Sequence, residues 1–157
     1  MNKIEVIRTF NAPVSLVWKT WTEPELVMRW WGPDHFTCPS AIIDFREGAT
    51  SIVCMRAPQS FGGADTFSIW TYQKIVPNQI IEFIQNLSDK DGNKINPTEI
   101  GMPPDFPLDI RTVVTFKDIG DNQTEMTVTE YADFGSISNF AKLGLEQSIA
   151  KMDVIFK

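Results

Sequence analysis

Residues 18–33 read Trp18-Lys-Thr-Trp-Thr-Glu-Pro-Glu-Leu-Val-Met-Arg-Trp-Trp-Gly-Pro33 and hold four of the five tryptophans in the chain. Apolar residues from Val14 to Trp21 recur at the spacing of one buried helix face, which predicts a short helix. A second short helix is predicted after it, ending at Gly32-Pro33. This aromatic surface precedes a long series of strand-like segments, so we expect it to form a helical cover over a sheet.

Both short helices carry start signals. Asn11 is a candidate cap residue, and Pro13 suits a first helical turn. Thr22 and Glu25 stand at the spacing of a capping box around Pro24. We therefore expect the two helices to begin near the two prolines.

Between the helices and the last twenty residues, apolar runs alternate with turn residues, which is the pattern of β-strands. Including one strand before the helices, seven are predicted, at residues 4–10, 41–45, 50–56, 64–76, 79–87, 108–117 and 124–131. The irregular stretch 89–107 is long for a compact domain, and such loops are usually functional or mobile. It opens with Asp89-Lys-Asp-Gly-Asn93, which lacks the closing glutamate of a calcium loop and is interpreted as a turn.

The clearest helix is predicted over residues 137–156. Its apolar stripe consists of Ile137, Phe140, Ala141, Gly144, Leu145, Ser148, Ile149, Met152, Ile155 and Phe156. A stripe of that length needs a broad apolar partner, and the sheet is the candidate. Gly144 and Ser148 are unusual within it, because glycine in a helix interior is about 1 kcal/mol less favourable than alanine. Either Gly144 permits close packing against a bulky residue, or the two small residues leave a hollow between helix and sheet.

Strand alternation indicates which side chains face that space. If the charged residues of each strand face solvent, the residues that alternate with them face inward. These are Val53, Met55, Ile81, Phe83, Gln85, Ile110, Thr112, Val114, Phe116, Met126, Val128 and Glu130. For the strand 64–76 either face could be buried. An inward Glu130 would have its pKa raised by loss of hydration and would be a candidate general acid, unless the strand ends there and the carboxylate reaches water.

His35 is the only histidine and lies in a predicted loop. A single imidazole excludes metal sites built from several histidines, and it makes any Ser-His-Asp triad depend on this residue alone. We expect a solvent-exposed side chain, with a proton carrier at the mouth of a pocket as the alternative. The chain has no phosphate loop, nucleophile elbow or dinucleotide glycine motif, and no metal or cofactor is expected.

Composition narrows the classes of partner. A net charge of −6 and 43% hydrophobic residues in 157 residues indicate one globular domain, 1–157, and disfavour nucleic acid and anionic membranes as partners. Glu5 and Arg8 interrupt the apolar core that a signal peptide requires, and no segment reaches the ~20 apolar residues of a membrane span. A cytoplasmic protein is expected, with Cys38 and Cys54 reduced.

The ordered combination of motifs resembles a known superfamily. The motifs are Phe10-Asn-Ala-Pro-Val-Ser-Leu-Val-Trp-Lys-Thr-Trp21, Trp30-Trp-Gly-Pro33, Asp44-Phe-Arg-Glu-Gly48, Ile75-Val-Pro-Asn-Gln-Ile-Ile-Glu-Phe83, Val113-Val-Thr-Phe116, Thr124-Glu-Met-Thr-Val-Thr129 and Gly144-Leu-Glu-Gln-Ser-Ile-Ala-Lys-Met152. Together they resemble the START-like (SRPBCC) superfamily, in the branch of the activator of heat-shock protein 90 ATPase. The resemblance implies an α+β helix-grip fold, with a curved antiparallel sheet of about seven strands wrapped around the last helix and a cavity for small hydrophobic ligands. Trp70 departs from the pattern by its size and would narrow that cavity.

Three functions are compatible with this resemblance, since fold membership alone selects none. The leading hypothesis is a non-enzymatic protein, monomeric or dimeric, that binds an apolar or aromatic molecule. The alternatives are a polyketide cyclase- or dehydratase-like enzyme using Glu130 or His35, and a chaperone-interacting module. Candidate ligand-binding residues are Trp31, Phe36, Val53, Met55, Trp70, Phe83, Gln85, Ile110, Thr112, Glu130, Gly144, Leu145, Ser148 and Met152.

Overall fold

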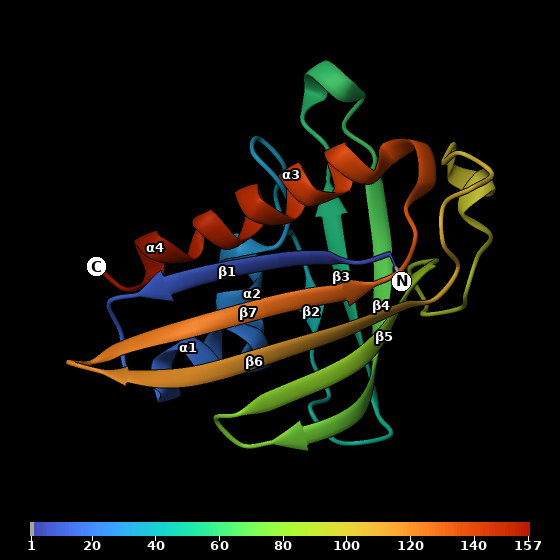
Figure 1. Ribbon diagram of the computed structural model, residues 1–157. Helices are drawn as coiled ribbons and strands as arrows, with labels where there is room; N and C mark the ends of the chain where they lie inside the picture. Colours follow the sequence, from blue (N-terminus) through green and yellow to red (C-terminus); the bar gives the residue numbers. More distant parts are fainter. Residues whose placement is uncertain (1) are drawn as a thin grey trace.

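The structure is a computed structural model that describes residues 2–157. Seven strands form one antiparallel sheet, and a long helix near the C-terminus lies across it (Figure 1). In chain order the elements are β1 (Ile4–Phe10), α1 (Val14–Thr22), α2 (Pro24–Trp30), β2 (Ala41–Ile42), β3 (Thr50–Arg56), β4 (Asp65–Val76), β5 (Ile80–Ser88), β6 (Ile110–Gly120), β7 (Gln123–Tyr131), α3 (Ser138–Ala150) and α4 (Met152–Ile155). Three short 3₁₀ turns stand at Gln59–Phe61, Pro97–Ile100 and Gly135–Ile137.

The sheet order is β1-β7-β6-β5-β4-β3-β2, with every neighbouring pair antiparallel. The first strand therefore pairs with the last, and α1 and α2 fill the interval between β1 and β2. The predicted α+β fold, with its curved antiparallel sheet and C-terminal helix, is confirmed. In Figure 1 the strands β1, β7 and β6 run nearly across those of β3 and β4, which gives the sheet a concave face.

Local sequence explains the tight turns. Asp121 and Asn122 join β6 to β7 with φ values of 55° and 57°. Two successive residues with positive φ make the turn whose twist matches that of paired strands, and Asp and Asn tolerate this conformation better than most residues. The β4–β5 connection has a single residue of this kind, Asn78, with φ 61°.

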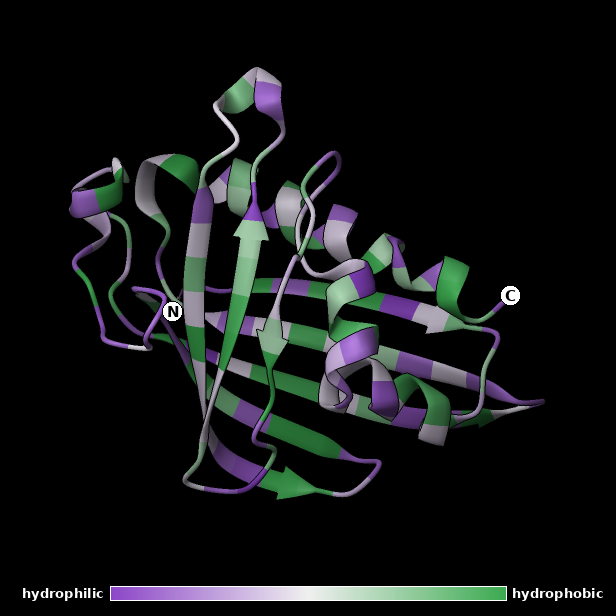
Figure 2. Cartoon of the chain, turned by 180° about the vertical axis from the view of Figure 1, so that it is seen from behind, coloured by the Kyte–Doolittle hydropathy of each residue, from purple (hydrophilic) through white to green (hydrophobic). Residues whose placement is uncertain are grey.

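Hydrophobic and hydrophilic residues alternate along parts of the strands, as the green and purple bands of Figure 2 show. On β6 the buried residues are Ile110, Thr112, Val114 and Phe116, which are the residues predicted to face inward. β4 breaks the pattern because both its faces are covered. Trp70 and Tyr72 are buried on the concave face, and Ile69 is buried on the other, where the turn at Gly92 packs against it.

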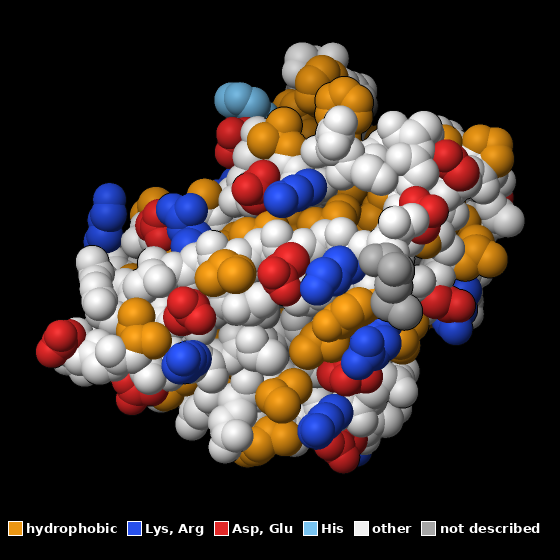
Figure 3. Space-filling model, in the orientation of Figure 1, with side chains coloured by type: hydrophobic (Ala, Val, Ile, Leu, Met, Phe, Trp, Pro, Cys, Tyr) orange, Lys and Arg blue, Asp and Glu red, His pale blue; other side chains and the backbone are white. Residues whose placement is uncertain are grey.

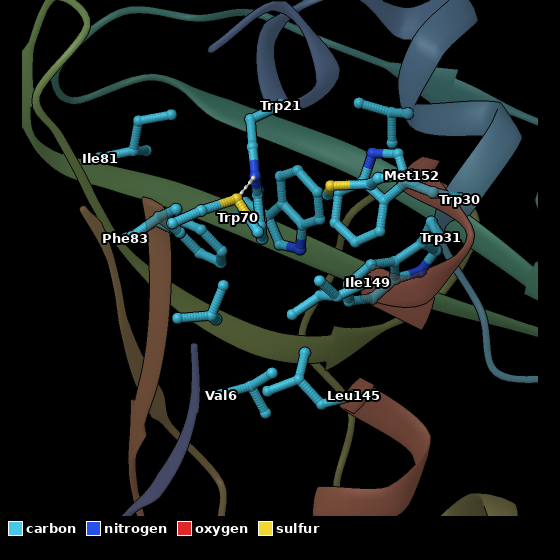
Figure 4. Close-up of a cluster of buried hydrophobic side chains, with 14 of the residues drawn as sticks. Val6, Trp21, Trp30, Trp31, Trp70, Ile81, Phe83, Leu145, Ile149 and Met152 are labelled. Atoms are coloured by element: carbon cyan, nitrogen blue, oxygen red, sulfur yellow. Dashed lines mark hydrogen bonds between the residues drawn. The ribbon is translucent and has the colours of Figure 1, made fainter. Parts of the chain in front are cut away.

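Aromatic side chains fill one end of the space between the helices and the sheet (Figure 4). Trp70 stacks on Phe83 with ring centroids 4.9 Å apart, and Trp21 lies 4.6 Å from Trp30 and 5.8 Å from Trp70. The Trp21 indole N–H donates to the sulfur of Met126 at 3.2 Å. Rings at these separations attract each other beyond their area of burial, so this end forms a solid core.

Two predictions about helix ends are wrong. Pro13 is itself the residue that precedes α1, and the Asn11 side chain instead accepts a hydrogen bond from Gln123 at 2.6 Å. Neither α1 nor α2 has a side-chain cap, so Thr22 and Glu25 form no capping box. The packing of the apolar faces of these helices against the core supplies what the caps do not.

The C-terminal helix differs from its prediction in one respect. The expected helix 137–156 is divided into α3 and α4 at Lys151. Ile149 and Met152, on either side of the break, are fully buried against the core, and Arg8 of β1 forms an ion pair with Asp153 of α4. These contacts fix the C-terminal half of the helix to the solid end of the molecule. No helix among residues 2–157 is long and apolar enough to span a bilayer.

Candidate functional site

A pocket of about 410 Å³ lies under α3, next to the aromatic core, which Trp31 joins to it. Its wall combines four regions of the chain. They are the sheet (Met55, Thr66, Ser68, Gln85, Leu87, Ile110 and Glu130), the segment after α2 (Trp31, Pro33 and Phe36), the loop before β6 (Met102 and Phe106), and the segment from β7 into α3 (Phe134, Ile137, Phe140, Ala141, Gly144, Leu145 and Ser148). Figure 3 shows hydrophobic side chains gathered below α3. The wall is mainly apolar, with a few polar groups.

Strand register brings the sheet residues of the wall together. Gln85 on β5 stands opposite Ile110 on β6, and Ser68 on β4 stands opposite Leu87 on β5. Glu130 is the next-to-last residue of β7, opposite Ile4 of β1 and Thr112 of β6. The pocket therefore occupies the end of the sheet where β5 and β7 finish and β4 and β6 begin.

Small residues on α3 leave space above this floor. A Cβ atom added to Gly144 would meet only the Cβ of Pro33, at 3.8 Å, which is an ordinary van der Waals contact. Close packing therefore does not require glycine here. Ser148 donates its hydroxyl proton to the Gly144 carbonyl at 2.9 Å, which satisfies the serine within the helix. The hollow expected between α3 and the sheet corresponds to this part of the pocket.

The segment after α2 is attached directly to the last helices. The Lys151 ammonium donates to the carbonyls of Pro33 at 2.9 Å and Phe36 at 3.0 Å, and the Asp34 amide donates to the Gln147 side chain at 3.1 Å. Burial lowers the pKa of Lys151, partly offset by the nearby Asp34 carboxylate. These contacts hold Pro33 and Phe36 on the wall, and Phe36 in turn contacts Phe61 with ring centroids 6.3 Å apart.

The long loop before β6 closes another side of the pocket. Phe106 packs edge-on against Phe134 with ring centroids 5.7 Å apart. The Asp105 carboxylate accepts hydrogen bonds from the Ser136 amide at 2.8 Å and the Ser136 hydroxyl at 3.1 Å. These interactions join the loop to the segment that leads into α3.

Among residues 2–157, Glu130 is the one ionisable residue on the wall. It is 9% exposed, and its carboxyl forms no hydrogen bond or ion pair with any other residue in the described chain. Loss of hydration raises its pKa from 4.5 to about 7. The neighbouring Thr112 hydroxyl donates to the Ile110 carbonyl at 3.3 Å instead. A carboxyl in this state exists in both protonation states near neutral pH and is free to interact with a bound molecule.

A second polar group in the wall also lacks a partner. The indole N–H of Trp31 is buried and makes no hydrogen bond within residues 2–157, whereas the N–H of its neighbour Trp30 donates to the Thr20 carbonyl at 2.7 Å. Buried donors are usually paired, so an unpaired donor in the wall of a pocket indicates a place for a ligand or a water molecule.

Nine of the fourteen predicted ligand-binding residues lie on the wall: Trp31, Phe36, Met55, Gln85, Ile110, Glu130, Gly144, Leu145 and Ser148. The other five, Val53, Trp70, Phe83, Thr112 and Met152, are at most 2% exposed and lie in the packed core instead. The alternation of a strand identifies the face of each residue correctly but not how far along the strand the pocket extends. Trp31 packs edge-on against Trp70 with ring centroids 5.2 Å apart, and Trp31 rather than Trp70 lies on the wall.

His35 is exposed and is not part of the wall, although Pro33 and Phe36 beside it are. Its φ of 72° turns the backbone at this point. His35 therefore lies beside the wall, and Glu130 is the candidate acid on the wall itself.

Ten residues of the wall were absent from the prediction: Pro33, Thr66, Ser68, Leu87, Met102, Phe106, Phe134, Ile137, Phe140 and Ala141. Some had a signal in the sequence. Leu87 continues the inward series of Phe83 and Gln85 by two residues, and Phe140 and Ala141 belong to the apolar stripe of the last helix. Met102 and Phe106 had none, because an irregular loop has no period from which to infer a direction.

Among residues 2–157 no cluster of three or more metal-ligating side chains occurs. Cys38 and Cys54 are both buried and free. Burial raises the pKa of the Cys38 thiol to about 11, so this group is a poor nucleophile.

Comparison with known families extends this description. Residues 11–157 match the family described as activator of Hsp90 ATPase homolog 1-like protein. The chain belongs to this family. Its sheet and C-terminal helix form the helix-grip fold that the resemblance implied.

Solved structures show the same fold in proteins of several bacteria. A protein from Chromobacterium violaceum is 19% identical with a TM-score of 0.79, covering 99% of this chain and 96% of that one. The AHSA1 protein from Silicibacter pomeroyi is 14% identical with a TM-score of 0.74, covering 98% of this chain and 96% of that one. The DynU16 protein of the dynemicin biosynthetic locus is 19% identical with a TM-score of 0.68, covering 98% of this chain but 46% of that one. A comparison with curated protein sequences finds no significant match.

Proposed function

We propose that this protein binds a small apolar or aromatic molecule in the pocket beneath α3, as a carrier or a sensor. The observation that supports it is a pocket of about 410 Å³ whose wall is apolar except for a few polar groups. Sites for small molecules have this composition, in which apolar side chains supply affinity and scattered polar groups supply orientation. Ligand binding needs no moving lid, because the contacts of Lys151 and Asp105 already hold the loops of the wall in place.

A fluorescent probe tests this proposal. N-Phenyl-1-naphthylamine is uncharged at neutral pH and fluoresces strongly in apolar surroundings, so saturable binding with one site per chain is expected. Gly144→Met places a longer apolar side chain on the pocket wall and should weaken binding at least tenfold, or about 1.4 kcal/mol. Lys142→Met makes a similar change at an exposed position of α3 and should leave binding unchanged.

The proposal fails if the probe shows no saturable binding to the folded protein. It also fails if the two methionine variants bind the probe equally well, because the probe would then occupy another surface. Circular dichroism and a thermal melt of each variant establish that the comparison is between folded proteins.

A second function is favoured by one residue. Glu130 has a pKa near the operating pH, which is the property of an efficient general acid or base, and it lies in a pocket able to hold a flexible substrate. A cyclase or dehydratase of the polyketide type would need these two features, a general acid or base and a pocket that shapes the substrate. The DynU16 protein, which shares this fold, comes from a biosynthetic locus.

For such an enzyme, Glu130→Gln should lower the rate of a dehydration or cyclisation assay by about 10²–10⁴-fold, the usual contribution of a general acid or base. His35→Ala should leave the rate unchanged, because His35 is outside the pocket. Equal rates for the Glu130 variant and the unmodified protein would exclude the acid role. Contact with heat-shock protein 90 stays a prediction, which a pull-down with the purified chaperone would test.

A further inference from the structure

The described wall of the pocket carries an acidic side chain and no basic one. None of the described residues on its wall is Lys, Arg or His, whereas one is Glu130. Three basic side chains next to wall residues already have partners. Lys151 donates to the Pro33 and Phe36 carbonyls, Arg56 of β3 forms an ion pair with Asp65, and Arg111 of β6 forms one with Glu82. A ligand with a carboxylate or a phosphate would therefore enter an apolar space with no cation to meet it and a carboxyl group nearby.

The carboxyl of Glu130 has no protein partner that would make it a structural group. The residues opposite Glu130 on the two adjacent strands do not bind its carboxyl. They are Ile4, which is apolar, and Thr112, whose hydroxyl donates to the Ile110 carbonyl. Burying an ionised carboxylate without a partner is unfavourable, and such a group responds by binding a proton. A ligand that supplies a positive charge favours the ionised form instead, because the opposite charge compensates for the lost hydration.

Aromatic rings surround the same space. Trp31, Phe36, Phe106, Phe134 and Phe140 all lie on the wall. The negative face of an aromatic ring attracts cations, and several rings together with a carboxylate are the means by which proteins hold organic ammonium groups. The apolar wall holds the rest of such a ligand.

We propose that the pocket selects molecules that carry a basic nitrogen on an apolar body, with the ammonium group held by the Glu130 carboxylate among aromatic side chains. This inference rests on the proposed binding function and specifies the class of ligand. It assigns Glu130 a binding role and predicts discrimination against fatty acids and other anionic amphiphiles. Desolvated interactions between charges and their partners are the ones that discriminate most strongly between similar ligands.

Three compounds with the same phenyl ring and four-carbon chain test it. 4-Phenylbutylamine is cationic at pH 7, 4-phenyl-1-butanol is neutral and 4-phenylbutyrate is anionic. Calorimetric titration of the unmodified protein should give the tightest binding for the amine, at least tenfold tighter than for the alcohol, and the weakest for the carboxylate. Glu130→Gln should reduce the preference for the amine to within about twofold of the alcohol and should improve binding of the carboxylate.

Glu146→Gln is the matched control, because Glu146 is exposed on α3 and lies outside the pocket. It should retain the order of the unmodified protein. If the alcohol binds as tightly as the amine, or if the preference survives in Glu130→Gln, the inference is wrong while the binding function stands. If none of the three compounds and no neutral probe binds the folded protein, both the inference and the proposed function are wrong.

Discussion

Glu130 gives the protein an unusual dependence of stability on pH. Because its pKa is about 7 in the folded protein, compared with 4.5 for a hydrated glutamate, the native state binds the proton more tightly than the unfolded state does. The free energy of unfolding therefore decreases as the pH rises from about 4.5 through 7. Above that range the decrease is complete, because the carboxyl is ionised in both states. The difference corresponds to at most about 3 kcal/mol.

Glu130→Gln should remove this contribution. Urea denaturation between pH 5 and 8 should show that the variant is more stable than the unmodified protein at pH 8, with a smaller difference at pH 5. Glu146→Gln, at an exposed position, should follow the curve of the unmodified protein. Parallel curves for the Glu130 variant and the unmodified protein would show that the carboxyl is well hydrated in solution.

Two glycines should respond oppositely to alanine. Gly144→Ala should stabilise the protein by up to about 1 kcal/mol, because alanine is the better helix former and its Cβ meets only Pro33. Gly135→Ala should destabilise it by about 1 kcal/mol or more, because φ is +57° and the Cβ would clash with the Asp105 carboxylate. Thermal melts of both variants measure the two effects. A destabilised Gly144→Ala would show that the space under α3 is more tightly filled than the structure indicates.

Among the elements, the segment after α2 depends on a helix far away in the sequence. Lys151→Met removes two hydrogen bonds from an ammonium group and leaves the Pro33 and Phe36 carbonyls without that partner. The expected loss is about 1–3 kcal/mol, with faster hydrogen exchange at the Phe36 amide, which donates to the Pro33 carbonyl.

Lys142→Met is the control for this change, since Lys142 is exposed on α3. It should alter neither the free energy of unfolding nor the exchange of the Phe36 amide beyond a few tenths of a kcal/mol. Equal effects of the two variants would mean that the contacts of Lys151 contribute nothing to the position of the segment.

The elements also show how far sequence reasoning reaches. Regular strands such as β6 could be predicted with their buried faces, because a period of two residues determines direction. β4 could not, since a loop covers its second face and both sides carry apolar residues. The caps of α1 and α2 were also mispredicted, because tertiary packing replaces the local hydrogen bonds that the sequence pattern indicates.

At the scale of the whole molecule, the concave side of the sheet has two unlike ends. Trp21, Trp30, Trp70 and Phe83 make one end solid, while α3 crosses the other end above a pocket. The sequence indicated a helix over a sheet with small residues facing it. Which end is filled depends on contacts between residues distant in the chain, so Val53, Thr112 and Met152 could not be assigned to the core from alternation alone.

The indole N–H signals of the five tryptophans measure this arrangement directly. In a ¹H–¹⁵N spectrum titrated with N-phenyl-1-naphthylamine, the Trp31 signal should shift most, because Trp31 alone among the tryptophans lies on the pocket wall and its N–H has no partner in the described chain. The Trp30 signal, whose proton is held by the Thr20 carbonyl, should move little. A spectrum in which no indole signal moves, or in which only the partly exposed Trp18 responds, would contradict a binding pocket beneath α3.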